Sequence, residues 1–347
     1  METTKTRSIG SNTDGRSTIT PMRAIVRDRY GSAEGLQLRN LEIPEPLENQ
    51  VLLKVYAAGL DRGVWHLMTG RPYLVRLVGY GVGRPKNIKL GTDVAGVVQA
   101  VGKNVTAFRV GDRVFGECDG SLAEYAVARA DKLSSMPSSA TFEQAAAVPG
   151  SGLTALQALR DHGRVRAGQR VLVIGASGGV GTFAVQLARA FGAVVTGVCS
   201  TAKAELVRSI GAEEVVDYTR TDLTHTDKRF DLILDIAGNR PLSKLRRLLT
   251  QTGTLVIVGG EGGDPWTGGM QRQLRAMLPS FTQQRLVAFI TNGNSSDLRT
   301  LAGLMDTLKL SPVIDRVCSL PEVPQAMRDL EAGRVRGKVV VSISSPA

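Results

Sequence analysis

Cysteine is scarce in this chain, and the few cysteines present lie far apart. Cys118, Cys199 and Cys318 form no C-x-x-C pair. This spacing indicates neither a disulfide framework nor a structural zinc knot. Because free cysteines suit a reducing compartment, the sequence predicts a cytoplasmic protein.

Long apolar runs are also missing. No stretch reaches the roughly 18 apolar residues that a membrane span needs, and residues 1–20 lack the apolar centre of a secretory signal. We expect residues 1–20 to form a disordered tail. An organellar targeting signal stays open, since the tail carries basic residues such as Lys5 and Arg7, although Glu2 and Asp14 count against one.

Aromatic residues make up only 5% of the chain, whereas positive charge is abundant, with a formal net charge of +11. The basic residues are spread along the chain rather than gathered in one run. Because a nucleic-acid surface needs stacking platforms or a concentrated basic patch, we expect no specific nucleic-acid partner. A general positive field that attracts an anionic cofactor explains the charge more simply.

The most informative segment is residues 171–200, VLVIGASGGVGTFAVQLARAFGAVVTGVCS. A β-branched strand, a glycine-rich turn, an amphipathic helix and a second strand follow one another without a break, which predicts a dinucleotide-binding βαβ unit. Gly178, Gly179 and Gly181 let backbone N–H groups approach a pyrophosphate and let the helix pack close to the strand, although Ala176 replaces the first glycine of the usual motif. The alternative is a flavodoxin-like turn that binds nothing.

The end of the second strand predicts which cofactor binds. An Asp or Glu about 20 residues after the motif would hold a free ribose 2′-hydroxyl, but this chain has Cys199, Ser200, Thr201 and Lys203 there. Hydroxyls and a cation suit a 2′-phosphate, and no carboxylate is expected to repel it, so the sequence predicts NADPH rather than NADH. The alternative makes Lys203 an ordinary solvated residue of the next helix.

The 347 residues suggest two domains. Up to Ala147 the chain has short β-branched runs broken by glycines, which predict a compact β-rich domain. From Gly168 strands alternate with helical segments, which predicts a parallel sheet covered by helices. A helix over 297–308 and a final strand, KVVVSI, follow, and we expect this last part to return to the first domain.

This order of parts resembles the medium-chain dehydrogenase/reductase superfamily along nearly the whole chain from Met22. The motifs that carry the resemblance are AAGLDRGVW (57–65), GTDVAGVVQAVGKNVTAFRVGDRVFG (91–116), AAAVPGSGLTALQAL (145–159) and GASGGVG (175–181) followed by GAEEVVDY (211–218). The resemblance implies an α/β protein with a GroES-like β-rich catalytic domain and a Rossmann domain with a doubly wound parallel sheet. The active site would lie between the two.

The resemblance also implies where the domains begin and end. Residues 21–147 would form the first part of the catalytic domain, and residues 148–285 the Rossmann NADPH-binding domain. Residues 286–347 would return, first as an edge strand of the Rossmann sheet and then to complete the catalytic domain. Since LVAFIT resembles the edge strand through which relatives join two Rossmann sheets, we expect a homodimer.

Zinc enzymes of this superfamily hold a catalytic metal with a Cys, a His and a further Cys. This chain has Asp61 at the first of these positions, Thr92 and Asp93 at the second, and residues 148–150 at the third. The four-cysteine lobe has no counterpart, because that region contains only Cys118. A tetrahedral site of nitrogen and sulfur ligands cannot be built from these residues, so the sequence predicts no metal.

The pattern instead resembles the zinc-free quinone oxidoreductase branch, which includes zeta-crystallin-like and reticulon-interacting reductases. That resemblance implies an NADPH-dependent reductase that transfers hydride to quinones or to α,β-unsaturated carbonyls such as enones and enals. Hydrogen-bond donors would stabilise the substrate oxygen, and a side chain or water would add a proton. The alternatives are an enoyl-thioester reductase, a zinc-type alcohol dehydrogenase, and a non-catalytic protein that senses NADPH or binds RNA.

The resemblance assigns cofactor contacts residue by residue. Thr154 matches a position at the nicotinamide end, and Gly259 lies at the end of a strand that borders the cofactor. Tyr218 either holds the 2′-phosphate or packs at the sheet edge. The other expected contacts are Ser177, Gly178, Gly179, Val180 and Gly181 at the pyrophosphate, and Ser200 and Lys203 at the 2′-phosphate.

Two side chains are candidates for the chemistry. Many relatives have Asn at the position of Asp61, whose carboxylate either orients substrate, relays a proton or caps the helix that follows. Tyr73 lies where enoyl-thioester reductases place a proton-donating Tyr, and the alternative is an aromatic that packs or lines the substrate site. Trp65 and Tyr80 either line an apolar pocket or belong to the core, and we expect His66 to be structural.

Overall fold

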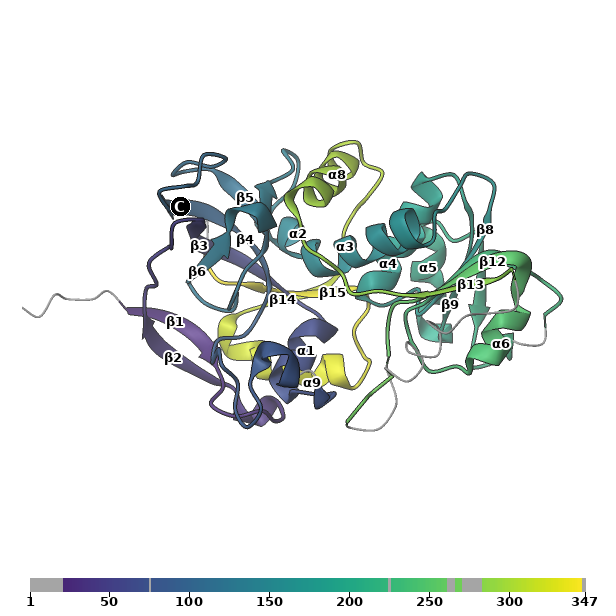
Figure 1. Cartoon of the computed structure of the whole chain (residues 1–347), viewed down its shortest axis with the longest axis horizontal. Coiled ribbons are helices and arrows are strands. Elements are labelled where there is room, and N and C mark those ends of the chain that lie inside the picture. Colours follow the sequence, from purple (N-terminus) through teal and green to yellow (C-terminus); the bar gives the residue numbers. More distant parts are fainter. Residues whose placement is uncertain (1–20, 75, 224–225, 261–265, 270–282, 345–347) are drawn as a thin grey trace, which may run out of the picture.

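The computed structural model of the chain describes residues 21–74, 76–223, 226–260, 266–269 and 283–344. The expected tail, residues 1–20, lies outside them. Figure 1 shows two sheets toward opposite ends of the long axis, with α3 between them. None of the helices in these ranges is long and apolar enough to cross a bilayer.

The β-rich part is built on a seven-stranded sheet with the order β14-β15-β3-β4-β5-β7, in which β6 pairs with β3 beside this path. Its strands are β3 (Gln50–Leu60), β4 (Asp93–Val101), β5 (Arg113–Glu117), β6 (Tyr125–Arg129), β7 (Leu133–Ser135), β14 (Ile314–Cys318) and β15 (Lys338–Ser342). The separate antiparallel pair consists of β1 (Pro21–Val26) and β2 (Gln37–Glu42). Strands from both ends of the chain therefore complete one sheet.

The second sheet has six parallel strands in the order β10-β9-β8-β11-β12-β13. They are β8 (Arg170–Ile174), β9 (Val194–Cys199), β10 (Glu214–Asp217), β11 (Phe230–Asp235), β12 (Leu249–Ile257) and β13 (Arg285–Ala288). Numbered along the chain from β8, this is the doubly wound order 3-2-1-4-5-6. The α/β fold predicted from the sequence, with a GroES-like part and a Rossmann part, is confirmed.

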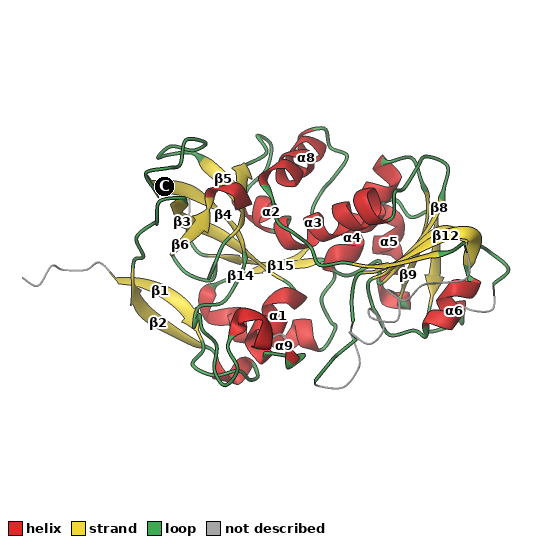
Figure 2. Cartoon of the chain, in the orientation of Figure 1, coloured by secondary structure: helices red, strands yellow, loops and turns green. Residues whose placement is uncertain are grey.

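Helices cover both sheets and join them (Figure 2). They include α1 (Arg62–Thr69), α2 (Phe142–Ala146), α3 (Pro149–Gln157), α4 (Gly179–Ala190), α5 (Ala204–Ser209), α6 (Leu242–Arg247), α8 (Ser295–Asp306) and α9 (Val323–Glu331). Helix α1 packs against α9 beside the β-rich sheet.

Helix α8 begins and ends two residues earlier than expected. The side chain of Asn294 accepts a hydrogen bond from the backbone N–H of Asp297 at 2.8 Å. Asn294 therefore caps the helix, which begins before the predicted first residue, Asp297. At the other end Leu308 has a φ of 57°, which no helix continues.

One hydrophobic cluster runs from sheet to sheet. It includes Ala57 and Phe115 of the β-rich sheet, Leu156 of α3, and Val173 and Leu234 of the Rossmann sheet, all of them buried. A shared core fixes the two parts against each other, because sliding one sheet would open cavities in close-packed apolar side chains. Polar side chains at this junction are therefore kept in position by the packing of both sheets.

Candidate active site at the junction of the two sheets

The glycine-rich turn joins β8 to α4 as predicted. Gly175 has a φ of 90°, a left-handed conformation that glycine adopts without strain. A Cβ on Gly181 would overlap the carbonyl oxygen of Gly175, so the helix and the turn touch backbone to backbone. A Cβ on Gly178 would meet only that same oxygen, at 3.6 Å. The first turn of α4 therefore offers uncapped N–H groups beside open backbone, which fits the pyrophosphate of a dinucleotide.

Three strand ends, those of β8, β11 and β12, approach one another next to this turn. A Cβ on Gly259 would overlap the carbonyl oxygen of Ile236, and one on Gly175 would lie 3.2 Å from the backbone nitrogen of Ala237. The ends of β8 and β11 are adjacent where the strand order of the sheet reverses, the place where such sheets bind ligands. Gly259 thus lies beside the expected cofactor position.

Lys203 is not a solvated lysine of the next helix. Its Nζ donates hydrogen bonds to the carbonyl oxygens of Gly333 and Val335, at 3.0 and 2.8 Å. Burial and the nearby guanidinium of Arg336 lower the pKa of Lys203. The charge of Arg336 thus acts on Lys203, which lies in the short helix that Ser200 begins. The sequence analysis did not predict Arg336, because it belongs to no recognisable motif.

Tyr218 follows β10, and 54% of its surface is exposed. A side chain packed at the sheet edge would be more buried, so the exposure disfavours that alternative. The expectation that no carboxylate lies at this end is wrong. Asp217 accepts hydrogen bonds from the hydroxyls of Thr201 and Thr219, which lower the pKa of its carboxyl. The carboxylate comes from β10, which pairs with β9 in the sheet, so residue spacing along β9 alone could not reveal it.

A cluster of buried charges lies where the β-rich sheet meets the glycine-rich turn. The side chain of Lys338 is 0% exposed, and its Nζ lies 3.2 Å from Asp61 Oδ2, 3.0 Å from Asp93 Oδ2 and 3.2 Å from Ser151 Oγ. Asp61 Oδ1 also accepts a hydrogen bond from the backbone N–H of Val64 at 3.2 Å. Of the three alternatives for Asp61 the structure shows the cap on α1, and the same carboxylate pairs with a lysine that the sequence analysis missed.

The lysine sets the charge of both acids. Although burial alone would raise it, the pKa of Asp61 is held below its ordinary value, mainly by Lys338. For Asp93 burial outweighs the same lysine and raises the pKa to about 6. One ammonium therefore interacts with both carboxyls.

The three positions that replace zinc ligands do converge here. A Cβ on Gly150 would lie 2.9 Å from both Asp61 Oδ2 and Asp93 Oδ1. The place between the carboxylates is taken by the ammonium of Lys338, and a second cation beside it would be repelled. Among the described residues no group of three His, Cys, Asp or Glu side chains could hold a metal ion. This donor set does not fit zinc.

A further acid borders the cluster. Glu117 ends β5 and stands directly opposite Asp93 of β4 in the antiparallel register. Its carboxyl also abuts the backbone of Gly293, where any Cβ would overlap Oε2. Burial and the charge of Asp93 raise the pKa of Glu117 to about 7. The sequence analysis missed this residue, since only strand pairing brings it to the site.

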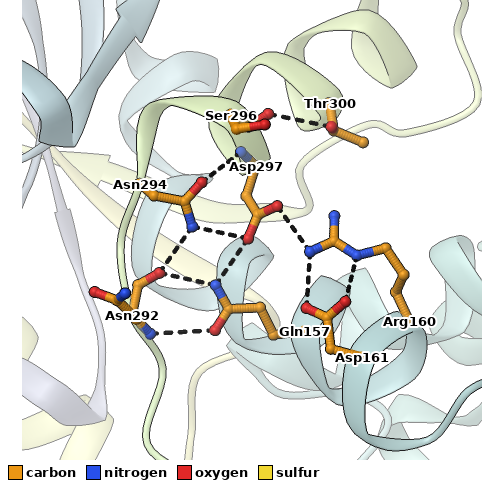
Figure 3. A network of polar contacts seen from close by, with 8 residues as sticks. All are labelled: Gln157, Arg160, Asp161, Asn292, Asn294, Ser296, Asp297 and Thr300. Atoms are coloured by element: carbon orange, nitrogen blue, oxygen red, sulfur yellow. Dashed lines mark hydrogen bonds and ion pairs between the residues drawn. The ribbon is translucent and has the colours of Figure 1, made fainter.

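The segment before α8 is fixed by the polar network in Figure 3. Gln157 Nε2 donates to the carbonyl oxygen of Asn292 at 2.8 Å and to Asp297 Oδ2 at 2.9 Å. Arg160 pairs with the other oxygen of Asp297 at 2.8 Å, and Asn294 Nδ2 donates to Asp297 Oδ2 at 2.9 Å. These contacts hold residues 292–294 against the C-terminal end of α3.

Thr154, expected at the nicotinamide end, lies on α3 beside the segment before α8. Its Oγ1 donates to the carbonyl oxygen of Gly150 at 2.7 Å and shares a hydrogen bond of 2.8 Å with Thr291 Oγ1. Ser151, one turn earlier on α3, contacts Lys338. A Cβ on Gly179 would lie 3.1 Å from Ser151 Oγ, so the charge cluster borders the turn expected to bind the pyrophosphate.

The contacts that the structure describes for Tyr73 involve Trp266 and Arg76 rather than the charge cluster. Its ring packs edge to face on Trp266 with centroids 5.3 Å apart, and the Arg76 guanidinium lies 4.4 Å from the Tyr73 centroid. The backbone N–H of Leu74 donates to the Trp266 carbonyl oxygen at 3.2 Å. None of these contacts joins Tyr73 to Asp61.

The neighbouring side chains differ in role. His66 Nδ1 is hydrogen-bonded to the carbonyl oxygen of Arg71 at 2.7 Å, which fits the expected structural role. Trp65 packs against the core around α1 and α9, whereas 48% of the Tyr80 surface is exposed.

Comparisons with known proteins agree with this architecture. Residues 47–138 match the alcohol dehydrogenase GroES-like domain, and residues 210–341 match the zinc-binding dehydrogenase family. The mitochondrial NAD(P)H oxidoreductase RTN4IP1 of Mus musculus is 35% identical, over 96% of this chain and 91% of that protein. A quinone oxidoreductase of Sus scrofa is 33% identical over 92% of this chain and 97% of its own length. The structure of the quinone oxidoreductase from Coxiella burnetii superposes with a TM-score of 0.81 and 29% identity, over 94% of this chain and all of that one.

Proposed function

The chain belongs to the medium-chain dehydrogenase/reductase superfamily, in its quinone oxidoreductase branch, and from that membership we propose a zinc-independent, NADPH-dependent reductase of quinones or α,β-unsaturated carbonyls. The observation that carries the proposal is the buried Lys338, which lies between Asp61 and Asp93 in the place of a catalytic metal. Conjugated substrates suit such a site, because their own oxygen spreads the developing charge and needs no Lewis acid.

The residues of the Rossmann part fit a nicotinamide dinucleotide with a 2′-phosphate. When bound, the cofactor would supply the hydride. The backbone of Ser177, Gly178, Gly179, Val180 and Gly181 would hold the pyrophosphate at the start of α4.

The adenosine end would carry the preference for NADPH, because the Asp217 carboxylate there already accepts hydrogen bonds from the hydroxyls of Thr201 and Thr219. Lys203 and Arg336 would supply two positive charges to the 2′-phosphate, and Ser200 and the exposed Tyr218 would add hydroxyl donors. NADH lacks the phosphate and would gain nothing from the two cations.

Among the chain's other candidates, Asp61 is proposed to position Lys338 rather than to exchange protons. Its two oxygens already cap α1 and pair with the ammonium. Tyr73, beside Trp266, is proposed as an aromatic near the substrate. An enoyl thioester stays the second substrate class to test, and Tyr73→Phe separates it, since a proton-donating Tyr73 would lose most of its rate on that substrate alone.

The test is oxidation of NADPH and NADH, followed by absorbance, against naphthoquinones, enones, enals and an enoyl thioester, with and without a chelator. We expect turnover that prefers NADPH and is indifferent to the chelator. In Arg336→Ala the KM for NADPH should rise about tenfold, equivalent to about 1.4 kcal/mol, while the KM for NADH stays unchanged. Turnover abolished by the chelator, or tight NADPH binding with no turnover, would contradict the proposal.

A further inference from the structure

Glu117 is an acid at the junction that has no role in the proposed function. Within the described part of the chain its carboxyl makes no hydrogen bond and no ion pair, although it is partly buried. Asp93 and Asp61, by contrast, both contact the ammonium of Lys338. Glu117 is thus the acid of this group that lacks a fixed positive partner.

Burial and strand pairing together explain why the pKa of Glu117 is raised. Residues directly opposite in an antiparallel pair carry their side chains on the same face, with Cβ atoms about 5 Å apart, and like charges there repel. Asp93 stands opposite Glu117, and the Asp61 carboxylate adds to the repulsion. Two negative charges so close in a poorly hydrated place favour the neutral form of one of them.

Within the described residues neither Lys132 nor Lys338 is paired with Glu117. Lys338, on β15, serves Asp61 and Asp93. Lys132, on the turn before β7, attracts Glu117 electrostatically, but its Nζ donates to Asn292 Oδ1 at 3.1 Å and to the Gly293 carbonyl oxygen at 2.6 Å. The combined effect leaves the pKa of Glu117 at about 7, so that near neutral pH a large fraction carries a proton.

The same short segment connects Glu117 with the expected nicotinamide end. The Glu117 carboxyl abuts Gly293, and two residues earlier Thr291 shares a hydrogen bond with Thr154. The network of Figure 3 fixes this segment to α3. A proton on Glu117 is therefore held close to the place where the substrate would accept hydride.

From this juxtaposition of Glu117, Asp93 and Gly293 we propose that Glu117 is the catalytic acid, which completes the reduction by protonating the substrate. The inference rests on the proposed function. Bound NADPH would supply the hydride, whose electron pair would form a C–H bond at the β-carbon, and the C=C electrons would move toward the carbonyl oxygen to give an enolate. The O–H bond of Glu117 then breaks, its proton goes to the enolate, and its electrons stay on the carboxylate. Because Glu117 is partly exposed, water returns the proton.

The first test is the pH dependence of kcat/KM with an enone. In the wild type the rate should be constant below about pH 7 and fall above it, since a raised folded-state pKa keeps the acid protonated only up to that pH. Glu117→Gln should lower the rate by about 10²–10⁴-fold and remove this break, with an unchanged Kd for NADPH. Glu331→Gln, which changes an exposed acid on α9, is the matched control and should keep the wild-type profile.

The second test needs no turnover. Infrared difference spectra of the free protein should show a protonated-carboxyl band that titrates near pH 7 in the wild type and is missing in Glu117→Gln. A wild type without this band overturns the inference. So does a Glu117→Gln variant that keeps the wild-type rate and pH profile, or a break that disappears in Tyr73→Phe instead.

These results separate the inference from the function on which it rests. A wild type that oxidises NADPH with conjugated carbonyls while Glu117→Gln does so equally well overturns the acid alone. A wild type that binds NADPH but reduces no substrate overturns both, even where the infrared band is present.

Discussion

Lys338 is completely buried beside two carboxyls that come from distant parts of the chain. Burying an ion is unfavourable unless its partners are well placed, and removing one partner leaves the others uncompensated. Here one ammonium serves Asp61, Asp93 and the hydroxyl of Ser151. The lysine therefore matters for stability as well as for the electrostatics of the site.

Replacing Lys338 tests this arrangement. Lys338→Met keeps much of the side-chain volume but strands the two acids, so the free energy of unfolding should fall by about 3–5 kcal/mol. Lys103→Met is the control, because Lys103 pairs with Glu48 at the surface, with 69% of its side chain exposed, and such pairs contribute about 0–1 kcal/mol. Urea unfolding followed by circular dichroism measures both. Equal losses would show that the buried lysine has no special role.

Among the elements, the start of α4 depends on close backbone contact. Gly181 lies against the carbonyl oxygen of Gly175, and both belong to the turn that would hold the pyrophosphate. Any side chain at Gly181 must push α4 away from β8, because the obstructing atom is backbone rather than a flexible side chain. The same backbone contact therefore fixes both the geometry of the expected anion site and the packing of α4 on β8.

A methyl group at this position should therefore disturb both. Gly181→Ala should lower the free energy of unfolding by about 1–3 kcal/mol and raise the Kd for NADPH at least about tenfold, measured by thermal unfolding and by fluorescence titration. Gly303→Ala is the matched control, since Gly303 lies inside α8 with nothing within 4 Å of an added Cβ. That variant should gain about 0.5–1 kcal/mol. Normal NADPH binding by Gly181→Ala would refute the backbone contact as the reason for the glycine.

Over the whole molecule, the segment 333–338 joins the two parts. Its first carbonyls accept hydrogen bonds from Lys203, the N–H of Gly337 donates to the Ser177 carbonyl oxygen at 2.9 Å, and Lys338 enters the charge cluster. This segment therefore contacts Lys203 at the expected adenosine end, the glycine-rich turn and the proposed catalytic junction in succession. This continuity follows from β15, which completes the β-rich sheet directly after passing the Rossmann turn.

The assembly remains a prediction. Strand β13 pairs with β12 on one side and forms the last position of the Rossmann sheet, as expected for LVAFIT, and among the described strands none pairs with its other edge. We expect light scattering to show a homodimer of the wild type. Val287→Lys places a charge on that edge and should shift the protein to monomers, whereas the exposed Val110→Lys, far along the chain, should not. A dimer that survives Val287→Lys would place the interface elsewhere.

What the sequence alone determined is local or repetitive. The glycine-rich turn, the alternation of strand and helix and the Asp61 cap each depend on residues within a few positions, because backbone hydrogen bonds and φ angles act over that range. The family resemblance extended these patterns to the fold. The roles of the predicted site residues as cofactor and substrate contacts remain predictions.

Only the tertiary structure decided which charges meet. Lys338 and Asp61 are 277 positions apart, and Lys338 and Asp93 are 245 apart. Glu117 faces Asp93 only through the register of β4 and β5, and Lys203 reaches the 333–335 carbonyls only through the path of the C-terminal strap. Such contacts depend on strand order and close packing, which combine distant segments in ways that no short pattern encodes.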